Sequence, residues 1–251
     1  MTKSVKALLA FSTVLTFCVV VLGWRIPGST LRPGGQQDTV DEEQFPIADE
    51  AAPEPPTPAE RVKKNNKEKK YGKYKDKIGP GVTVASVRYH WPPGFPALPV
   101  SQSDAVIVGE VADARAYVTD DKSAVYSEFS VQVAEVLKNA ADSPLEAGRS
   151  IVVERVGGRV RYPSGHICRF SIAGWGMPRV SRRYVLFLNT NDQDEGYHLV
   201  TGYELRNGLI FPLDRILSSE TDSDAYVKMD EAEFWMRLDA EIARALSLTP
   251  R

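Results

Sequence analysis

The side chains that most often carry out catalysis or bind metals are scarce in this chain. His90, His166 and His198 are its three histidines, and Cys18 and Cys168 are its two cysteines. His166 and Cys168 would share one face of a strand, but a metal site needs three or four convergent ligands, and the spacing supplies no others. Two cysteines, one of them within the apolar N-terminal run, build neither a disulfide framework nor a Cys-based zinc site. We therefore expect an ordinary strand histidine beside a buried thiol, and no bound metal or other cofactor.

Motifs of the main enzyme classes are also absent from the sequence. There is no Gly-x-Ser-x-Gly elbow, phosphate-binding loop, dinucleotide fingerprint or His-Glu-x-x-His motif. Carboxylates such as Asp104, Glu110 and Glu128 are present, but their spacing singles out no acid/base pair. We expect no catalytic residues. The alternative is a cell-envelope enzyme, such as a hydrolase, without a recognisable motif.

An arginine-rich tract is the feature most suggestive of binding. From Arg155 to Asn191 there is no Asp or Glu, while arginines recur among aromatic side chains. Arginine together with aromatic residues is typical of interface hot spots. The candidate surface consists of Arg159, Arg161, Arg169, Trp175, Arg179, Arg182 and Arg183. It would suit an acidic protein segment or a polyanionic envelope polymer; alternatively, these arginines pair with carboxylates elsewhere on the domain.

The overall charge argues against nucleic-acid binding. The chain carries 31 Lys and Arg against 33 Asp and Glu. Of these, 13 basic and 10 acidic residues precede Gly79, so the remainder is net acidic. A domain that binds nucleic acid as a whole is normally basic. An OB-type nucleic-acid binder is therefore disfavoured.

The N-terminus reads as a membrane anchor over residues 1–24. Ala7 to Trp24 holds 18 residues without a charge, and as a helix it would span about 27 Å, enough for a bilayer core. No small-residue cleavage site follows it, which favours an uncleaved signal anchor over a cleaved signal that would release a secreted protein. Lipidation at Cys18 is a third reading. Lys3 and Lys6 place the N-terminus in the cytoplasm, so the C-terminal domain would lie outside it, in the periplasm or at the cell surface.

Residues 25–78 read as a disordered linker. Prolines recur in it, an acidic stretch runs from Asp38 to Glu60, and Arg61 to Lys77 then carries nine basic residues against Glu68 and Asp76. Blocks of like charge usually stay solvated. The alternative is that the lysine block adheres to an anionic polymer or lipid surface.

Residues 79–251 change to the two-residue period of β-strands. We expect strands at Val82–His90, Asp104–Val118, Val125–Lys138, His166–Ile172, Tyr184–Asn189, Tyr197–Glu204 and Gly208–Leu213. In the third, Glu135 breaks the apolar face, which indicates a bulge near Ala134.

Gly157-Gly158 lies between two β-rich runs from Ile151 to Tyr162, which predicts a hairpin with a two-residue turn. In that hairpin Glu154 would lie opposite Arg161, and would be the only acid near Arg159 and Arg161.

A helix from Asp230 to Leu246 ends the pattern. Asp230 and Glu233 resemble a capping box, with Met229 and Phe234 at the positions of a hydrophobic staple. Apolar residues then recur at helical spacing, at Phe234, Leu238, Ile242 and Ala245. We expect this stripe to pack on the barrel; the alternative is that it is offered to a partner.

The order DAVIVGEV, VYSEFSVQVAEVLKN, IVVERVGG and GMPRVSRRYVLFLN resembles bacterial proteins with an OB-like barrel similar to the netrin and tissue-inhibitor-of-metalloproteinase module. The resemblance covers roughly residues 100–215 and implies an antiparallel barrel that serves as a binding domain. In the inhibitor family an N-terminal cysteine engages the zinc of the target, and this barrel begins without one, so protease inhibition is not carried over.

The sequence thus predicts a mainly β protein, an antiparallel OB-like barrel with a C-terminal α-helix, preceded by a transmembrane helix and a disordered linker. Its expected function is that of a single-pass, membrane-tethered, extracytoplasmic binding or scaffolding module.

Overall fold

The computed structural model describes residues 45–72, 79, 84–87, 94–139, 144–191, 196–215 and 225–248. The chain divides into two units, Met1–Glu42 and Glu43–Arg251, and all described residues belong to the second. The predicted anchor at Ala7–Trp24 therefore lies outside the described residues. Within the part that is described, no helix is long and apolar enough to cross a membrane.

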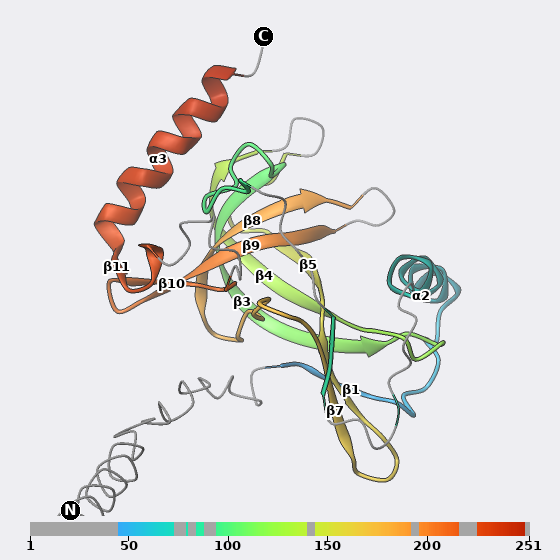
Figure 1. Cartoon of the computed structure of the whole chain (residues 1–251). Coiled ribbons are helices and arrows are strands. Elements are labelled where there is room, and N and C mark those ends of the chain that lie inside the picture. Colours follow the sequence, from blue (N-terminus) through green and yellow to red (C-terminus); the bar gives the residue numbers. More distant parts are fainter. Residues whose placement is uncertain are drawn as a thin grey trace, which may run out of the picture. The chain divides into compact units, whose positions relative to one another are not determined.

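The second unit is built around a closed circuit of paired strands (Figure 1). The circuit consists of β3 (Ala105–Val118), β4 (Val125–Lys138), β5 (Ser150–Val156), β9 (Tyr197–Arg206) and β8 (Arg183–Thr190). Each strand pairs with the next, and β8 pairs back onto β3. All these pairings are antiparallel except β5 with β9, which is parallel. The predicted β-rich architecture is confirmed, and we call the circuit the ring.

The register of β3 against β4 contains the predicted bulge. Val108 lies opposite Glu135 and Gly109 opposite Val133, so Ala134 is the extra residue. On one side of the bulge Val131 and Val133 point into the ring. Glu135 is exposed, as the break in the apolar pattern indicated.

Alternating side chains of the ring strands fill its interior. The largest buried residues there are aromatic or branched aliphatic, among them Ile107, Phe129, Tyr184, Leu186 and Leu188. The side chains in between point to the outer surface of the ring. The helices described below bury part of that surface.

The helix α3 (Glu231–Leu248) covers one outer surface of the ring, as predicted. Asp230 caps it, since its Oδ1 accepts the backbone N–H groups of Ala232 and Glu233 at 2.9 and 3.3 Å. Phe234 and Leu238 are fully buried against Val108, Phe187 and Tyr203 of the ring, with the short strands β10 (Leu209–Pro212) and β11 (Met229–Asp230) beside them.

A second, smaller sheet has the order β1-β6-β7-β2. Its central strands, β6 (Gly158–Arg161) and β7 (Ile167–Ile172), form an antiparallel hairpin. The outer strands, β1 (Ile47–Asp49) and β2 (Val84–Val87), come from the N-terminal part of the unit, and each is parallel to its neighbour.

The predicted hairpin around Gly157-Gly158 is wrong. β5 pairs with β4 and β9, whereas β6 pairs with β1 and β7, so the two glycines carry the chain from the ring into the second sheet. Their φ angles are +122° and +154°, a region that favours glycine. A Cβ on Gly158 would lie 2.6 Å from Cγ1 of Val125. The glycines are needed for this sharp passage between packed sheets, not for a turn.

The predicted disordered linker over 25–78 is wrong for two segments. β1 is part of the second sheet, and Pro58–Tyr71 forms the helix α2, which lies beside β4 and β5 (Figure 1). The capping box is complete: the Thr57 hydroxyl accepts the Glu60 N–H, and the Glu60 carboxylate accepts the Thr57 N–H. Pro58 at the first helical position removes one N–H that would otherwise lack a partner.

Candidate binding face

The helix α2 turns one side toward the ring. Lys64, Lys70 and Tyr71 each lie three or four residues from Lys67, so the four share one helix face. Lys67 and Tyr71 are the buried residues of α2. Lys63 and Lys69, on the other side, are exposed. The lysine block is thus divided between a face that contacts the domain and a face in solvent.

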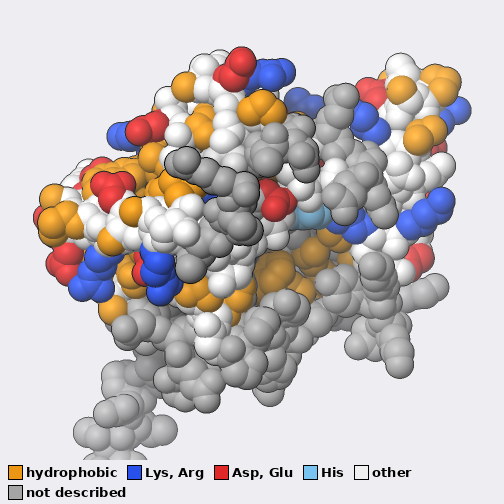
Figure 2. Space-filling model, turned by 90° about the horizontal axis from the view of Figure 1, so that it is seen from above, with side chains coloured by type: hydrophobic (Ala, Val, Ile, Leu, Met, Phe, Trp, Pro, Cys, Tyr) orange, Lys and Arg blue, Asp and Glu red, His pale blue; other side chains and the backbone are white. Residues whose placement is uncertain are grey.

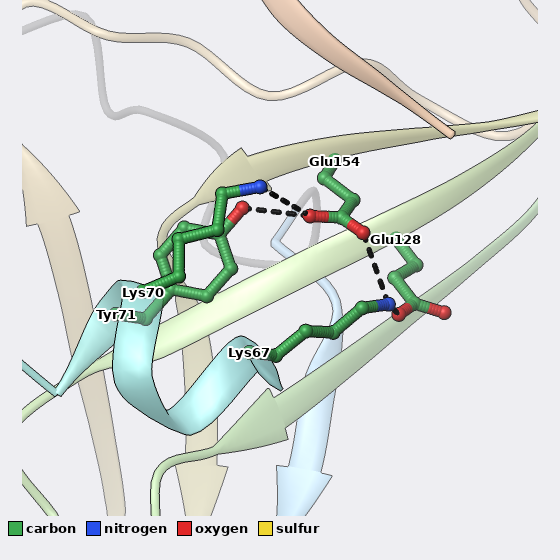
Figure 3. A network of polar contacts seen from close by, with 5 residues as sticks. All are labelled: Lys67, Lys70, Tyr71, Glu128 and Glu154. Carbon is green, nitrogen blue, oxygen red and sulfur yellow. Dashed lines mark hydrogen bonds and ion pairs between the residues drawn. The ribbon is translucent and has the colours of Figure 1, made fainter. Parts of the chain in front are cut away.

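Two carboxylates of the ring contact this face of the helix (Figure 3). Glu128 of β4 and Glu154 of β5 lie directly opposite each other in the register, and both point outward. The Nζ of Lys67 contacts both, and its distance to Oε1 of Glu154 is 3.0 Å. Lys70 Nζ lies 3.1 Å from Oε2 of Glu154, to which the Tyr71 hydroxyl donates a hydrogen bond of 2.8 Å. One turn of α2 therefore supplies three donors to two adjacent carboxylates.

Burial and neighbouring charges shift the pKa values of Glu154 and Lys67 in opposite directions. The Glu154 side chain is only 1% exposed. Burial alone would raise the pKa of Glu154, but the ammonium groups of Lys67 and Lys70 and the Tyr71 hydroxyl outweigh burial and hold it below its usual range. Burial alone would likewise lower the pKa of Lys67, but hydrogen bonding and attraction to Glu128 and Glu154 raise it. Both groups are therefore charged at neutral pH.

Aromatic rings extend the contact to β3. The Tyr71 ring stacks on Tyr126 of β4, with a centroid distance of 4.7 Å and an interplanar angle of 19°. Tyr126 in turn stacks on Tyr117 of β3, at 5.3 Å and 18°. Tyr117 is 36% exposed, so the platform continues beyond the edge of α2.

The loop between β3 and β4 also contacts α2. Lys64 Nζ lies 2.7 Å from an oxygen of Asp120 and 2.8 Å from one of Glu54. The backbone N–H of Asp120 donates to Glu68 of α2 at 2.8 Å. We call the surface formed by Tyr117, Asp120, Tyr126, Glu128 and Glu154 the α2 face.

The α2 face was not predicted from the sequence, although signals for it exist. Thr57-Pro58-x-Glu60 is a capping box that starts a helix within the expected linker. Glu128 occupies the outward parity of β4, whose other parity is largely apolar. The signal in β5 is weaker, because Val152 and Val156 share the parity of Glu154 and Arg155 lies on the other. The expected neighbours of Glu154, Arg159 and Arg161, lie instead on β6.

The residues of the predicted arginine surface lie in different parts of the domain and have different neighbours. Arg159 and Arg169 lie opposite each other on β6 and β7, where the Nε of Arg159 donates to the Phe45 carbonyl at 2.8 Å and the Arg169 guanidinium lies 5.4 Å from the centre of the Phe45 ring. Arg161 lies 3.4 Å from Asp49.

The other three arginines of this surface lie at or shortly before the start of β8. The Arg179 N–H donates to the Tyr184 hydroxyl, Arg182 lies 3.9 Å from Glu204, and Arg183 is opposite Glu110 in the register. Figure 2 shows basic side chains interspersed with acidic and apolar ones over the face in view. Because several of these arginines have carboxylate or backbone partners, pairing within the domain accounts for much of the tract.

Trp175 lies over a buried ion pair. The Arg155 guanidinium is 4.8 Å from the centre of the Trp175 ring, and its Nη2 is 2.6 Å from Oδ1 of Asp214. The same oxygen accepts the Gly176 N–H at 2.9 Å. Asp214, after β10, thus joins Arg155 of β5 to the loop after β7, and Trp175 is half-buried in that arrangement.

Among the residues that the structure describes, the histidines and Cys168 do not form a metal site. No group of three or more His, Cys, Asp or Glu side chains there is placed to hold a metal ion. Cys168 is buried on β7, and burial raises the pKa of its thiol. His166 precedes β7 and its ring lies against Tyr162; His90 lies outside the described residues.

Comparison with known proteins does not assign the chain to a family. No protein-family model matches the chain, and no curated protein matches it either.

Proposed function

We propose that residues 43–251 form an OB-like binding domain and that the α2 face is its ligand site. The proposal includes the netrin-like resemblance, the uncleaved anchor at Ala7–Trp24 and a position outside the cytoplasm. The observation that carries it is the pair of adjacent carboxylates, Glu128 and Glu154, neutralised by lysines of a single helical turn.

The strand order supports the OB-like part of the proposal. Taken along the chain, the ring strands β3, β4, β5, β8 and β9 close in the order first, second, third, fifth, fourth. A five-stranded Greek-key ring of this kind is what the OB architecture requires. The apolar stripe of α3 packs against Val108, Phe187 and Tyr203, none of which belongs to the α2 face.

The position of α2 supports the choice of site. In OB folds, ligands bind on the second and third strands beside the loop that joins the first and second. Here those elements are β4, β5 and the β3–β4 loop, and α2 contacts all three, at Glu128, Glu154 and Asp120. The face therefore already binds a segment of the chain where such a domain would bind its ligand.

The charge of the face favours a basic protein partner. Carboxylates repel nucleic acid and anionic envelope polymers, whereas they match lysine and arginine side chains. An acidic partner for the arginine-rich tract, the prediction from the sequence alone, has less support because its members are spread over different surroundings.

Site-specific crosslinking in the native envelope tests the proposal. A photo-reactive amino acid is placed at Tyr117, at the edge of the α2 face, or as a control at Met236, which is 68% exposed on α3. We expect a discrete protein adduct from position 117 and none from 236. Adducts only from 236, or none from either position, would place the binding surface elsewhere.

A further inference from the structure

We infer that α2 is an intramolecular stand-in for a helix of another protein, and that the α2 face binds in trans a helical segment with two lysines three residues apart and an aromatic residue directly after the second. This inference rests on the proposed function and specifies the ligand of that site.

The α2 face needs a cationic occupant. Glu128 and Glu154 lie directly opposite each other on adjacent strands, an arrangement of like charges that destabilises a sheet unless it is neutralised. Lys67 lies between them and Lys70 beside them. If α2 leaves, two carboxylates and the Tyr126 ring are uncovered together, and a second cationic helix meets the same requirement.

Apart from Tyr71, which lies in a buried hydrophobic cluster with Tyr126 and Val160, α2 is held by polar contacts. Of its 14 residues, Lys67 and Tyr71 are the buried ones, and the aliphatic Val62 is 58% exposed. A helix that buries so little apolar surface gains little from the hydrophobic effect. Its docking depends on ion pairs and on the Tyr71–Tyr126 stack, which an incoming helix of the same chemistry reproduces.

The strands on either side of α2 pair in the second sheet rather than with the ring. The preceding strand β1 pairs with β6, and the following strand β2 pairs with β7. The lysine contacts of α2, in contrast, are with β4, β5 and the β3–β4 loop of the ring. The ion pairs of α2 and the strand pairing of the second sheet thus involve different partners, although Tyr71 shares a buried hydrophobic cluster with Ala48 of β1 and Val160 of β6.

The spacing of donors sets the specificity. Lys67, Lys70 and Tyr71 occupy positions i, i+3 and i+4, which lie within one helical turn. The two ammonium groups contact Glu154 from one side of the helix while the ring covers Tyr126. A segment of equal charge with its lysines on another face of the helix would not present all three groups.

A trans-peptide experiment tests the inference. The full chain carrying Lys67→Ser, Lys70→Ser and Tyr71→Ser has its own α2 disabled, and a fluorescent peptide spanning Thr57–Gly72 is added. The control peptide exchanges Lys67 and Lys70 in position with Asn65 and Asn66, so its composition and net charge are unchanged. We expect the first peptide to bind at least tenfold more tightly than the control by fluorescence anisotropy, and Glu154→Gln in the chain to remove that difference.

Equal binding of the two peptides, or binding that Glu154→Gln leaves unchanged, would overturn the inference. If the triple variant does not fold by circular dichroism, Tyr71→Ala alone loosens α2 while keeping both lysines, and the same two peptides are compared. If the wild-type helix binds phosphatidylglycerol vesicles and neither peptide binds the chain, α2 is a membrane-binding element instead. A protein adduct at position 117 without peptide binding would leave the proposed function standing and reject only the choice of ligand.

Discussion

Glu154 is the residue on which α2 docking depends most. Its carboxylate is buried and receives Lys67, Lys70 and the Tyr71 hydroxyl. Glu154→Gln removes the ion pairs of Glu154 with both lysines and leaves the one between Lys67 and Glu128. Breaking a buried ion pair from one side costs about 3–5 kcal/mol. We expect trypsin to cleave within α2 more than tenfold faster in this variant, because cleavage follows the population of undocked helix.

Glu135→Gln is the matched control for that change. Glu135 is exposed on β4, the same strand as Glu128, so its loss should leave the rate of cleavage in α2 unchanged. Equal rates for the two variants would mean that Glu154 does not hold the helix.

The buried pair Arg155–Asp214 should behave differently from a surface ion pair. Arg155→Met leaves the Asp214 carboxylate buried without its cation, and we expect a loss of about 3–5 kcal/mol in the free energy of unfolding. The double variant Arg155→Met with Asp214→Leu removes both charges and should recover much of that loss. Urea denaturation compares the wild type, Arg155→Met and the double variant; a double variant no more stable than Arg155→Met would contradict this account of the pair.

At the scale of elements, docking of α2 should depend on pH at both ends of the range. The pKa of Glu154 is lowered in the folded protein, so its contribution is present above the pKa of an unfolded Glu, about 4.3, and is lost as the pH falls through the lower folded value. The pKa of Lys67 is raised, so its contribution is present below about 10.4 and is lost as the pH rises through the higher folded value.

Near-ultraviolet circular dichroism of the stacked Tyr71 and Tyr126 rings follows this dependence. We expect a plateau between the two limits and an acid transition below about pH 4.3 that the Glu154→Gln variant lacks. An acid transition of the same size in both proteins would assign it to other groups.

The elements show what the sequence pattern can and cannot predict. Strands β3, β4 and β9 and the helix α3 were predictable because each has an apolar face with the right period, and β8 because it is a short continuous apolar run. The partners of β5 and β6 were not, because glycines between two strands are equally consistent with a turn and with a passage from one sheet to another. The position of Gly158 against Val125 distinguishes the two, and that contact exists only in the folded chain.

The helix α2 was missed for a different reason. Helix prediction relies on an apolar stripe, and α2 buries a lysine and a tyrosine instead. Its packing is decided by carboxylates that lie 61 and 84 residues further along the chain. The same distance in sequence explains why the arginine tract looked unpaired: Arg161 meets Asp49, which lies 112 residues earlier.

At the scale of the whole molecule, the proposed anchor gives a topology that can be measured. A reporter active only outside the cytoplasm, fused after Arg251, should be active, and the mature protein should keep its N-terminus. A silent reporter would reverse the proposed orientation. A mature N-terminus near Arg25 would replace the anchor by a cleaved signal, and the domain would then be released rather than tethered.

The most direct test of the α2 face as a binding site is amide exchange in the intact chain. The isotope-labelled full chain is titrated with the unlabelled Thr57–Gly72 peptide, and exchange is followed by NMR. The peptide is taken to millimolar concentration, because a tethered segment competes at an effective concentration of about that size. We predict that the amides of α2 lose protection as the peptide is added, while those of β4 and β5 keep theirs and the position-exchanged peptide has no effect. Unchanged protection of α2, or the same loss with both peptides, would contradict binding of a lysine-bearing helix at Glu128 and Glu154.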